Sequence, residues 1–190
     1  MSLGLDEIEP AIEAALETAL KPDKDKDNKQ KERIVFAAAA NGGAGKARAY
    51  PACKPGVICV NASDGRGGDI QCLSPAAVVG EDNFVTLGIH IESRWKRKDV
   101  FKSGTSFAAP IAAALAANIL EFARLELEMK FAEQYWLYSS KGMRRVLRRF
   151  SVDVGGYRFL CPWKGPEGRR LDREYLKGQL KEAFSVDYHK

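Results

Sequence analysis

The first twenty residues place apolar side chains at helical spacing among acidic ones. The apolar positions are Ile8, Ile12, Ala15, Leu16 and Leu20. Spacings of three and four residues bring these side chains to one face, which predicts an amphipathic helix. The polar run at 21–33 that follows predicts a solvated loop.

Three short apolar runs come next, IVFAAAA at 34–40, GVICV at 56–60 and NFVTLGI at 83–89. Each is too short to favour a helix, and each is bounded by charged or glycine-rich segments. Runs of this kind are typical of strands that are buried on both faces of a parallel sheet. The sequence therefore predicts three parallel core strands.

The second half of the chain predicts mainly helices. One long helix is expected over 106–130, and its first half is apolar on every side, as in a helix buried in the middle of a fold. Also expected are a basic helix within 138–150 capped by Ser139 or Ser140, a strand within 156–163 and a final helix over 171–184. Helices that alternate with buried strands indicate an α/β fold with a mainly parallel sheet flanked by helices.

The composition limits the class of protein but does not indicate a function. The 190 residues suffice for one ordinary domain, and 45% are apolar and 29% charged, as in globular proteins. The net charge of +5 is too small to indicate nucleic acid by itself. We expect no membrane contact because no apolar run approaches the length of a span. The first residues lack signal-peptide features, which favours an intracellular location only weakly, because we expect the chain to start inside a domain; the location therefore stays open.

The chain has four cysteines, Cys53, Cys59, Cys72 and Cys161, and none forms a C-x-x-C pair. Zinc sites need such short pairs, so we expect no metal site and no cofactor. Four cysteines are also too few for a disulfide scaffold. Free thiols are therefore predicted, although a Cys53–Cys72 bridge stays open.

The stretch FKSGTSFAAP at 101–110 raises the main chemical question. Ser106 is a good helix N-cap, and Gly104 permits the turn before it. A serine at the start of a buried helix also lies beside free amides and the positive end of the helix dipole, where negative charge is stabilised. Ala108 stands where the G-x-S-x-G elbow needs its second glycine, so that motif does not match.

The segment SGTSFAAP resembles the serine motif of the subtilisin-like serine peptidases, G-T-S-x-A-x-P. Gly104, Thr105, Ser106, Ala108 and Pro110 all match it. The resemblance implies that Ser106 is the nucleophile of a serine endopeptidase and that the fold is a subtilisin-like three-layer sandwich.

Further segments resemble the same family. IVFAAAANGGAG is similar to its strand ending in A-A-G-N, which makes Asn41 the oxyanion-hole residue and puts Ala40 where the family has glycine. MSLG resembles a strand whose edge pairs with substrate, which implies substrate binding by Ser2, Leu3 and Gly4. YPA at 50–52 and VICVNASD at 57–64 follow the family's pattern, whereas LGIHIES lacks the proline of the family's A-P-G segment.

The family's catalytic aspartate and histidine have no counterpart here. Neither DTG nor HGT occurs, and the two histidines, His90 and His189, lie in unsuitable contexts, His90 on a strand-like stretch and His189 beside the end of the chain. We therefore expect residues 1–130 to be the C-terminal half of a peptidase domain, incomplete at its N-terminal side, with 131–190 as a basic helical extension. The isolated chain should then be inactive.

The implied partners are a polypeptide substrate and the missing N-terminal half of the domain. Two alternatives stay open. One is a non-catalytic fragment that acts as a binding module. The other is a basic nucleic-acid-binding module built on RWKRK at 94–98 and RRVLRRF at 144–150, although such runs are more often solvated faces.

Overall fold

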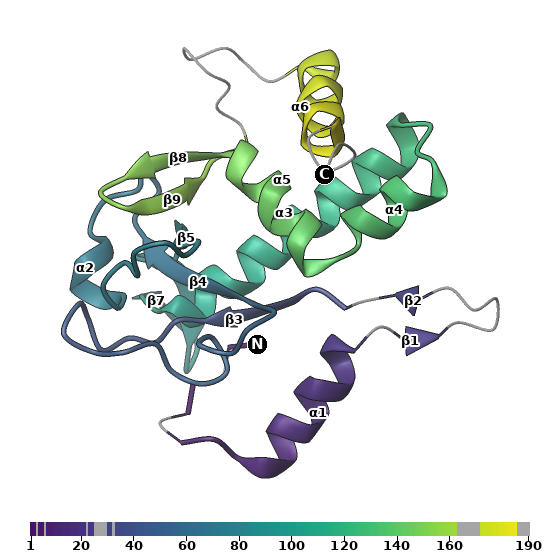
Figure 1. Ribbon diagram of the computed structural model, residues 1–190. Helices are drawn as coiled ribbons and strands as arrows, with labels where there is room; N and C mark the ends of the chain where they lie inside the picture. Colours follow the sequence, from purple (N-terminus) through teal and green to yellow (C-terminus); the bar gives the residue numbers. More distant parts are fainter. Residues whose placement is uncertain are drawn as a thin grey trace.

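The computed structural model of the chain describes residues 1–2, 4–5, 7–21, 23–24, 30–31, 33–162 and 172–185. Figure 1 shows the arrangement of its helices and strands. In chain order these are α1 (Pro10–Leu20), β1 (Asp23–Lys24), β2 (Gln30–Lys31), β3 (Val35–Ala38), β4 (Val57–Ser63), α2 (Ile70–Leu73), β5 (Phe84–Leu87), β6 (Ile91–Trp95), β7 (Lys98–Lys102), α3 (Thr105–Glu126), α4 (Phe131–Leu137), α5 (Ser140–Arg149), β8 (Ser151–Val154), β9 (Tyr157–Leu160) and α6 (Arg173–Ser185).

A five-stranded sheet in the order β3-β4-β5-β9-β8 forms the middle of the fold. The pairs β3–β4, β4–β5 and β5–β9 are parallel, and β8 is antiparallel to β9. Every residue of β4 is buried. The three predicted core strands are thus confirmed, because continuous apolar runs satisfy a strand that is covered on both faces.

The two faces of the sheet have separate apolar layers. Ile58 and Val60 of β4 pack with alanines of α3 on one face, and Val57 and Cys59 pack on the other face with Leu20 of α1 among their neighbours. This alternation follows from the two-residue period of a strand. Figure 1 accordingly shows α1 on the side of the sheet away from α5. The architecture is a helix–sheet–helix sandwich with a mostly parallel sheet, as predicted.

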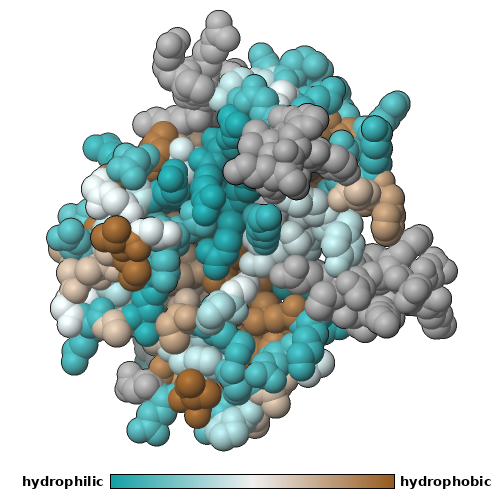
Figure 2. Space-filling view, in the orientation of Figure 1, coloured by the Kyte–Doolittle hydropathy of each residue, from teal (hydrophilic) through white to brown (hydrophobic). Residues whose placement is uncertain are grey.

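The long helix α3 lies against β3, β4 and β5. Small residues on one side permit this close approach: Ala108, Ala109, Ala112 and Ala116 are buried. Contrary to the composition argument, α3 is long and apolar enough to cross a membrane, but its contacts are those of a core helix. The face of the molecule in Figure 2 is largely hydrophilic, with hydrophobic residues in small separate areas.

The last third of the chain joins the same core. Ser139 is the N-cap of α5 and accepts a hydrogen bond from the Gly142 amide (3.0 Å), so the predicted cap is confirmed. Met143 and Leu147 of α5 pack with α3 in the main core. The predicted boundary at residue 130 falls between α3 and α4, and both α5 and β9 beyond it belong to the central sandwich.

Several sequence predictions need correction. Ile8 precedes α1 and is 64% exposed, because Pro10 starts the helix after it. The predicted loop at 21–33 contains the short antiparallel pair β1–β2. The long helix ends at Glu126 rather than residue 130, and α4 follows it. His90 is not a strand residue: it lies in a bend with φ of 56° between β5 and β6.

A carboxylate under α5 joins the C-terminal elements to the sheet. Asp82 precedes β5, and its side chain is only 5% exposed. Arg148 of α5 donates two hydrogen bonds to it, from Nε at 2.5 Å and Nη2 at 2.9 Å. Arg144 and Arg158 lie 3.6 and 3.8 Å away. A bidentate pair inside a cluster of cations is among the stronger polar contacts in proteins.

We expect Asp82→Ala to lower the free energy of unfolding by about 2 kcal/mol, because it leaves charge-assisted hydrogen bonds unmade beneath α5. Equilibrium urea unfolding measures the change. The matched control is Glu121→Ala, which removes an exposed ion pair to Arg124 on α3 and should leave stability almost unchanged. Equal effects of the two substitutions would contradict this role of Asp82.

Candidate active site

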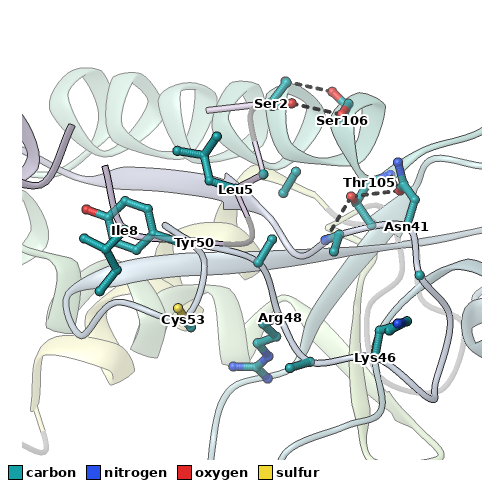
Figure 3. A pocket seen from close by; sticks show the side chains of 16 residues that line it. Ser2, Leu5, Ile8, Asn41, Lys46, Arg48, Tyr50, Cys53, Thr105 and Ser106 are labelled. Atoms are coloured by element: carbon teal, nitrogen blue, oxygen red, sulfur yellow. Dashed lines mark hydrogen bonds between the residues drawn. The ribbon is translucent and has the colours of Figure 1, made fainter. Parts of the chain in front are cut away.

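The C-terminal end of β3 and the first turn of α3 meet at a pocket of about 690 Å³. Figure 3 shows Asn41, Thr105 and Ser106 at one end of this pocket, with Ser2 beside Ser106. Parallel strands direct their carboxyl ends to one edge of a sheet, and in open α/β folds that edge is the usual place for a ligand. The predicted residues Asn41 and Ser106 therefore line one pocket, on the same side of the sheet.

Asn41 is held by Thr105, the residue next to Ser106. Its Oδ1 accepts hydrogen bonds from the Thr105 backbone N–H at 2.8 Å and from the Thr105 hydroxyl at 3.0 Å. No acceptor for the Asn41 Nδ2 group lies among the residues that the structure describes. Two donors on Oδ1 fix the amide plane, so that the N–H donors of Asn41 remain available to a ligand.

Ser106 lies in the first turn of α3, after the N-cap Gly104. Its hydroxyl donates to the Ser2 carbonyl at 3.0 Å, and the Ser2 hydroxyl donates to the Ser106 carbonyl at 2.9 Å. Asn41 bonds to Thr105, the residue before Ser106, and Asn41 and Ser106 line the same pocket.

The start of α3 has an open amide at Ser106. The Thr105 amide donates to Asn41 and the Phe107 amide to the Gly104 carbonyl at 3.0 Å. For the Ser106 amide, the described residues provide no acceptor. Because the first amides of a helix lack intrahelical partners and lie at the positive end of its dipole, this position stabilises an anion.

Ala40 takes the conformation that a glycine would adopt easily. Its φ is 128°, in the range that L-residues avoid, and its amide donates to the Thr105 hydroxyl at 3.3 Å. The family motif that this segment resembles has glycine at the position of Ala40. The structure shows the consequence, which is backbone strain directly beside Asn41.

The N-terminal residues complete this side of the pocket. Met1 lies along β3, where its carbonyl accepts from the Ala38 amide at 3.0 Å. Ser2 and Gly4 line the pocket, and Leu5 pairs with Tyr50 in an antiparallel bridge. Leu3, predicted with them, lies outside the described residues, as does His189.

Tyr50 lies at the far end of the pocket and anchors α1. Its hydroxyl donates a hydrogen bond to the Glu13 carboxylate, which also accepts one from the Lys54 ammonium group. Burial, and secondarily the Glu13 carboxylate, raises the pKa of Tyr50 to about 12. Tyr50 is therefore a neutral hydrogen-bond donor at physiological pH and holds the pocket wall rather than supplying a base.

The cysteines are free thiols, so the open Cys53–Cys72 bridge is not formed. Burial raises the pKa of Cys59 to about 11, which keeps that thiol protonated and unreactive. Within the described ranges, no three His, Cys, Asp or Glu side chains gather in a way that could hold a metal ion.

Comparison with known proteins decides the family. The sequence model described as "Subtilase family" (Peptidase_S8) matches residues 1–151. The chain belongs to the subtilase family. The match extends past residue 130 and takes in α4 and α5. No match was found among curated proteins.

Solved protease structures share the fold of this subtilase. A serine-to-alanine mutant of the protease domain of PatA aligns at 22% identity and a TM-score of 0.60, over 96% of this chain and 58% of that one. The self-cleaved protease domain of PatA aligns at 22% identity and a TM-score of 0.62, over 96% of this chain and 61% of that one. The prenylagaramide maturation protease PagA aligns at 18% identity and a TM-score of 0.59, over 95% of this chain and 59% of that one. This chain thus spans about three-fifths of the length of these structures.

Thr105 contributes to the site in a way that the sequence did not indicate. Thr105 was noted only as a motif residue, yet it positions Asn41 through both its amide and its hydroxyl. The one feature of the sequence that could have indicated this role is the position of Thr105 between the helix-capping Gly104 and the candidate nucleophile Ser106. The sequence could not give the contact itself, because Asn41 and Thr105 lie 64 residues apart.

We expect Ala40→Gly to raise the free energy of unfolding of this subtilase by about 1 kcal/mol. Relief of a strained φ outweighs the added entropy of glycine in the unfolded chain. Urea unfolding measures the gain. The control Ala47→Gly, at an exposed position without a positive φ, should instead destabilise. A loss of stability in Ala40→Gly would show that φ is not strained here.

Proposed function

We propose that this chain supplies the nucleophile and the oxyanion hole of a serine endopeptidase. The observation that carries the proposal is the double hydrogen bond from Thr105 to Asn41 Oδ1, at 2.8 and 3.0 Å, directly beside Ser106. It leaves two groups of donors open at one end of one pocket, the Asn41 amide and the Ser106 backbone N–H. Membership of the subtilase family and the protease fold support the same reaction class.

In the proposed reaction the Ser106 hydroxyl oxygen attacks the carbonyl carbon of the scissile peptide bond. The carbonyl oxygen gains negative charge as the tetrahedral intermediate forms. Asn41 Nδ2 and the Ser106 amide donate to that oxygen, and the dipole of α3 adds to the stabilisation. These donors are fixed before the substrate binds, so little reorganisation is needed during the reaction.

The proton of Ser106 requires a base that the described residues do not offer. The hydroxyl donates to the Ser2 carbonyl, which cannot take up the proton. His90 is exposed in the bend between β5 and β6, and its only hydrogen bond to the described structure is through the backbone, to Ser103 Oγ at 3.0 Å. We therefore propose that a polypeptide segment outside these 190 residues supplies the catalytic histidine and aspartate.

The sheet has a place for such a segment. β3 is the edge strand of the five-stranded sheet, and Phe36, Ala37 and Ala38 are buried although, among the described residues, Met1 is the one whose backbone pairs with that edge. An apolar edge with unpaired backbone groups favours addition of a further strand. Substrate would reach the pocket beside Ser2 and Gly4, and Leu3 between them is proposed as part of the same edge.

A fluorophosphonate probe tests the nucleophile. We expect Ser106 to react when the chain is expressed together with an upstream segment that contains the proposed aspartate and histidine, and to stay unlabelled when residues 1–190 are expressed alone. A serine without a base is a weak nucleophile. In-gel fluorescence and mass spectrometry of the labelled peptide give the site.

Ser106→Ala in the longer polypeptide is the control and should abolish labelling. Fast labelling of residues 1–190 alone, lost in Ser106→Ala, would contradict the external base and place it within this chain. No labelling in either polypeptide would contradict the proposed function itself and favour a non-catalytic binding module.

The oxyanion hole has a separate test in the active longer polypeptide. We expect Asn41→Ala to reduce kcat by about 10²–10³ with little change in KM, the loss measured for the corresponding donor in subtilisin, another subtilase. Hydrolysis of a fluorogenic peptide measures both constants. Asn118→Ala, on the exposed side of α3, is the matched control. A loss below about threefold in Asn41→Ala would contradict the assignment of Asn41.

A further inference from the structure

β6 and β7 form a two-stranded hairpin between β5 and α3, with basic residues concentrated at its tip. Residues 91–102 include five basic and two acidic side chains, a net charge of +3. Lys96, Arg97 and Lys98 at the tip are exposed, and none of them forms an ion pair with a described residue. Arg94 and Asp99 approach only to 4.0 Å, with both side chains exposed.

The other basic motif of the chain is used inside the fold. Arg144 and Arg148 contact Asp82, and Arg149 pairs with Glu182 at 2.8 Å. Three of its arginines therefore pair with carboxylates of the same chain. The cations at the hairpin tip are different, because they face solvent and are available to a ligand.

The turn of the hairpin carries a conformational cost. Lys96 and Arg97 form its two-residue loop, with φ values of 48° and 65°. Positive φ at both positions is typical of a type I′ turn, for which Asn-Gly is the preferred sequence. Two long cationic residues thus occupy positions where other residues would fold more easily, which indicates that their charge serves an interaction.

Two exposed aromatic side chains accompany these charges. Trp95 is 60% exposed and Phe101 66% exposed. The register pairs Trp95 with Lys98 and Phe101 with Glu92, so that the two rings lie on opposite faces of the hairpin. Lys102 Nζ lies 5.4 Å from the centre of the Trp95 ring, a cation–π contact that keeps a further cation on that face.

The base of the hairpin is fixed beside the candidate nucleophile. The Gly104 amide donates to the Gly88 carbonyl at 2.8 Å, and the His90 amide donates to Ser103 Oγ at 3.0 Å. Lys102 precedes Ser106 by four residues, which places it within about 14 Å of Ser106 along the chain. A polypeptide bound at Ser106 has the hairpin within its reach.

We infer that the β6–β7 hairpin binds an acidic segment of the polypeptide substrate several residues away from the scissile bond. This inference rests on the proposed function and adds a substrate class to it. Carboxylates of the substrate pair with Lys96, Arg97 and Lys98, and its apolar groups contact Trp95. Among the described residues that line the pocket beside Ser106 there is neither aspartate nor glutamate, and Lys46 adds a positive charge of the same sign, whereas Arg48 is already paired with Glu81.

Geometry favours a peptide over nucleic acid. Single-stranded nucleic acid is held by aromatic rings on which successive bases stack, and Trp95 and Phe101 lie on opposite faces. Duplex-binding proteins neutralise several phosphates, on the order of 6–10 in well-studied cases, whereas the tip presents three adjacent cations. A short acidic peptide matches this charge and size.

Binding by the 190-residue chain with Ser106→Ala tests the inference without any need for catalysis. The probes are a fluorescein-labelled peptide of about twelve residues that alternates Glu and Gly, and its Gln counterpart, followed by fluorescence anisotropy. We expect the Glu peptide to bind about tenfold more tightly, with an advantage that shrinks as salt is added.

The decisive variant is Lys96→Asn with Arg97→Gly, which removes both charges and installs the preferred turn sequence, so the hairpin stays folded. It should reduce the affinity for the Glu peptide about tenfold. The control pair Lys21→Gln with Lys181→Gln removes the same charge from exposed positions elsewhere and should have no effect on it. Circular dichroism verifies folding of both variants.

Equal affinity for the two peptides, or equal loss in both variant pairs, overturns the inference. Tighter binding of single-stranded DNA with the same number of charges also overturns it, in favour of a nucleic-acid surface. The proposed function fails separately, through an unreactive Ser106. Binding of the Glu peptide together with an unreactive Ser106 would therefore remove the peptidase reaction and leave the acidic-ligand site.

Discussion

The hydrogen bonds between Asn41 and Thr105 are the contact on which the candidate site depends. They join the end of β3 to the beginning of α3, two elements that are far apart in the sequence. One amide oxygen satisfies two donors and thereby sets the direction of the remaining Asn41 donors. The neighbouring Ser106 amide stays open because a helix cannot satisfy its own first N–H groups.

The core makes this contact possible. Alanines on α3 let the helix lie directly against the sheet, so its first turn ends up at the level of the strand ends. A bulkier face would move the helix away from β3 and separate Thr105 from Asn41. The backbone strain at Ala40 lies beside this contact, where the chain leaves β3. Packing of small residues and local strain together position the polar groups.

Charge is divided between structure and surface in this subtilase. Asp82 forms ion pairs with arginines of α5 and β9 and so connects the last third of the described chain to the sheet. For the cations of the β6–β7 hairpin, the described part of the chain offers no such buried acceptor. Two basic motifs of similar appearance in the sequence thus have different physical roles, which depend on whether a buried carboxylate lies within reach.

The sequence by itself determined the core strands, the buried helix, a serine cap for α5 at 139 or 140 and the candidate pair Ser106 and Asn41. These features depend on local periodicity, capping chemistry and motif spacing, all of which involve residues that can be read directly from the sequence. It did not determine the hairpin at 91–102, the end of α3, or the bend at His90. Only the tertiary structure decided that Thr105 holds Asn41, that Ser106 donates to Ser2 and that β9 joins the sheet, because such contacts link residues distant in sequence and depend on how the helices pack.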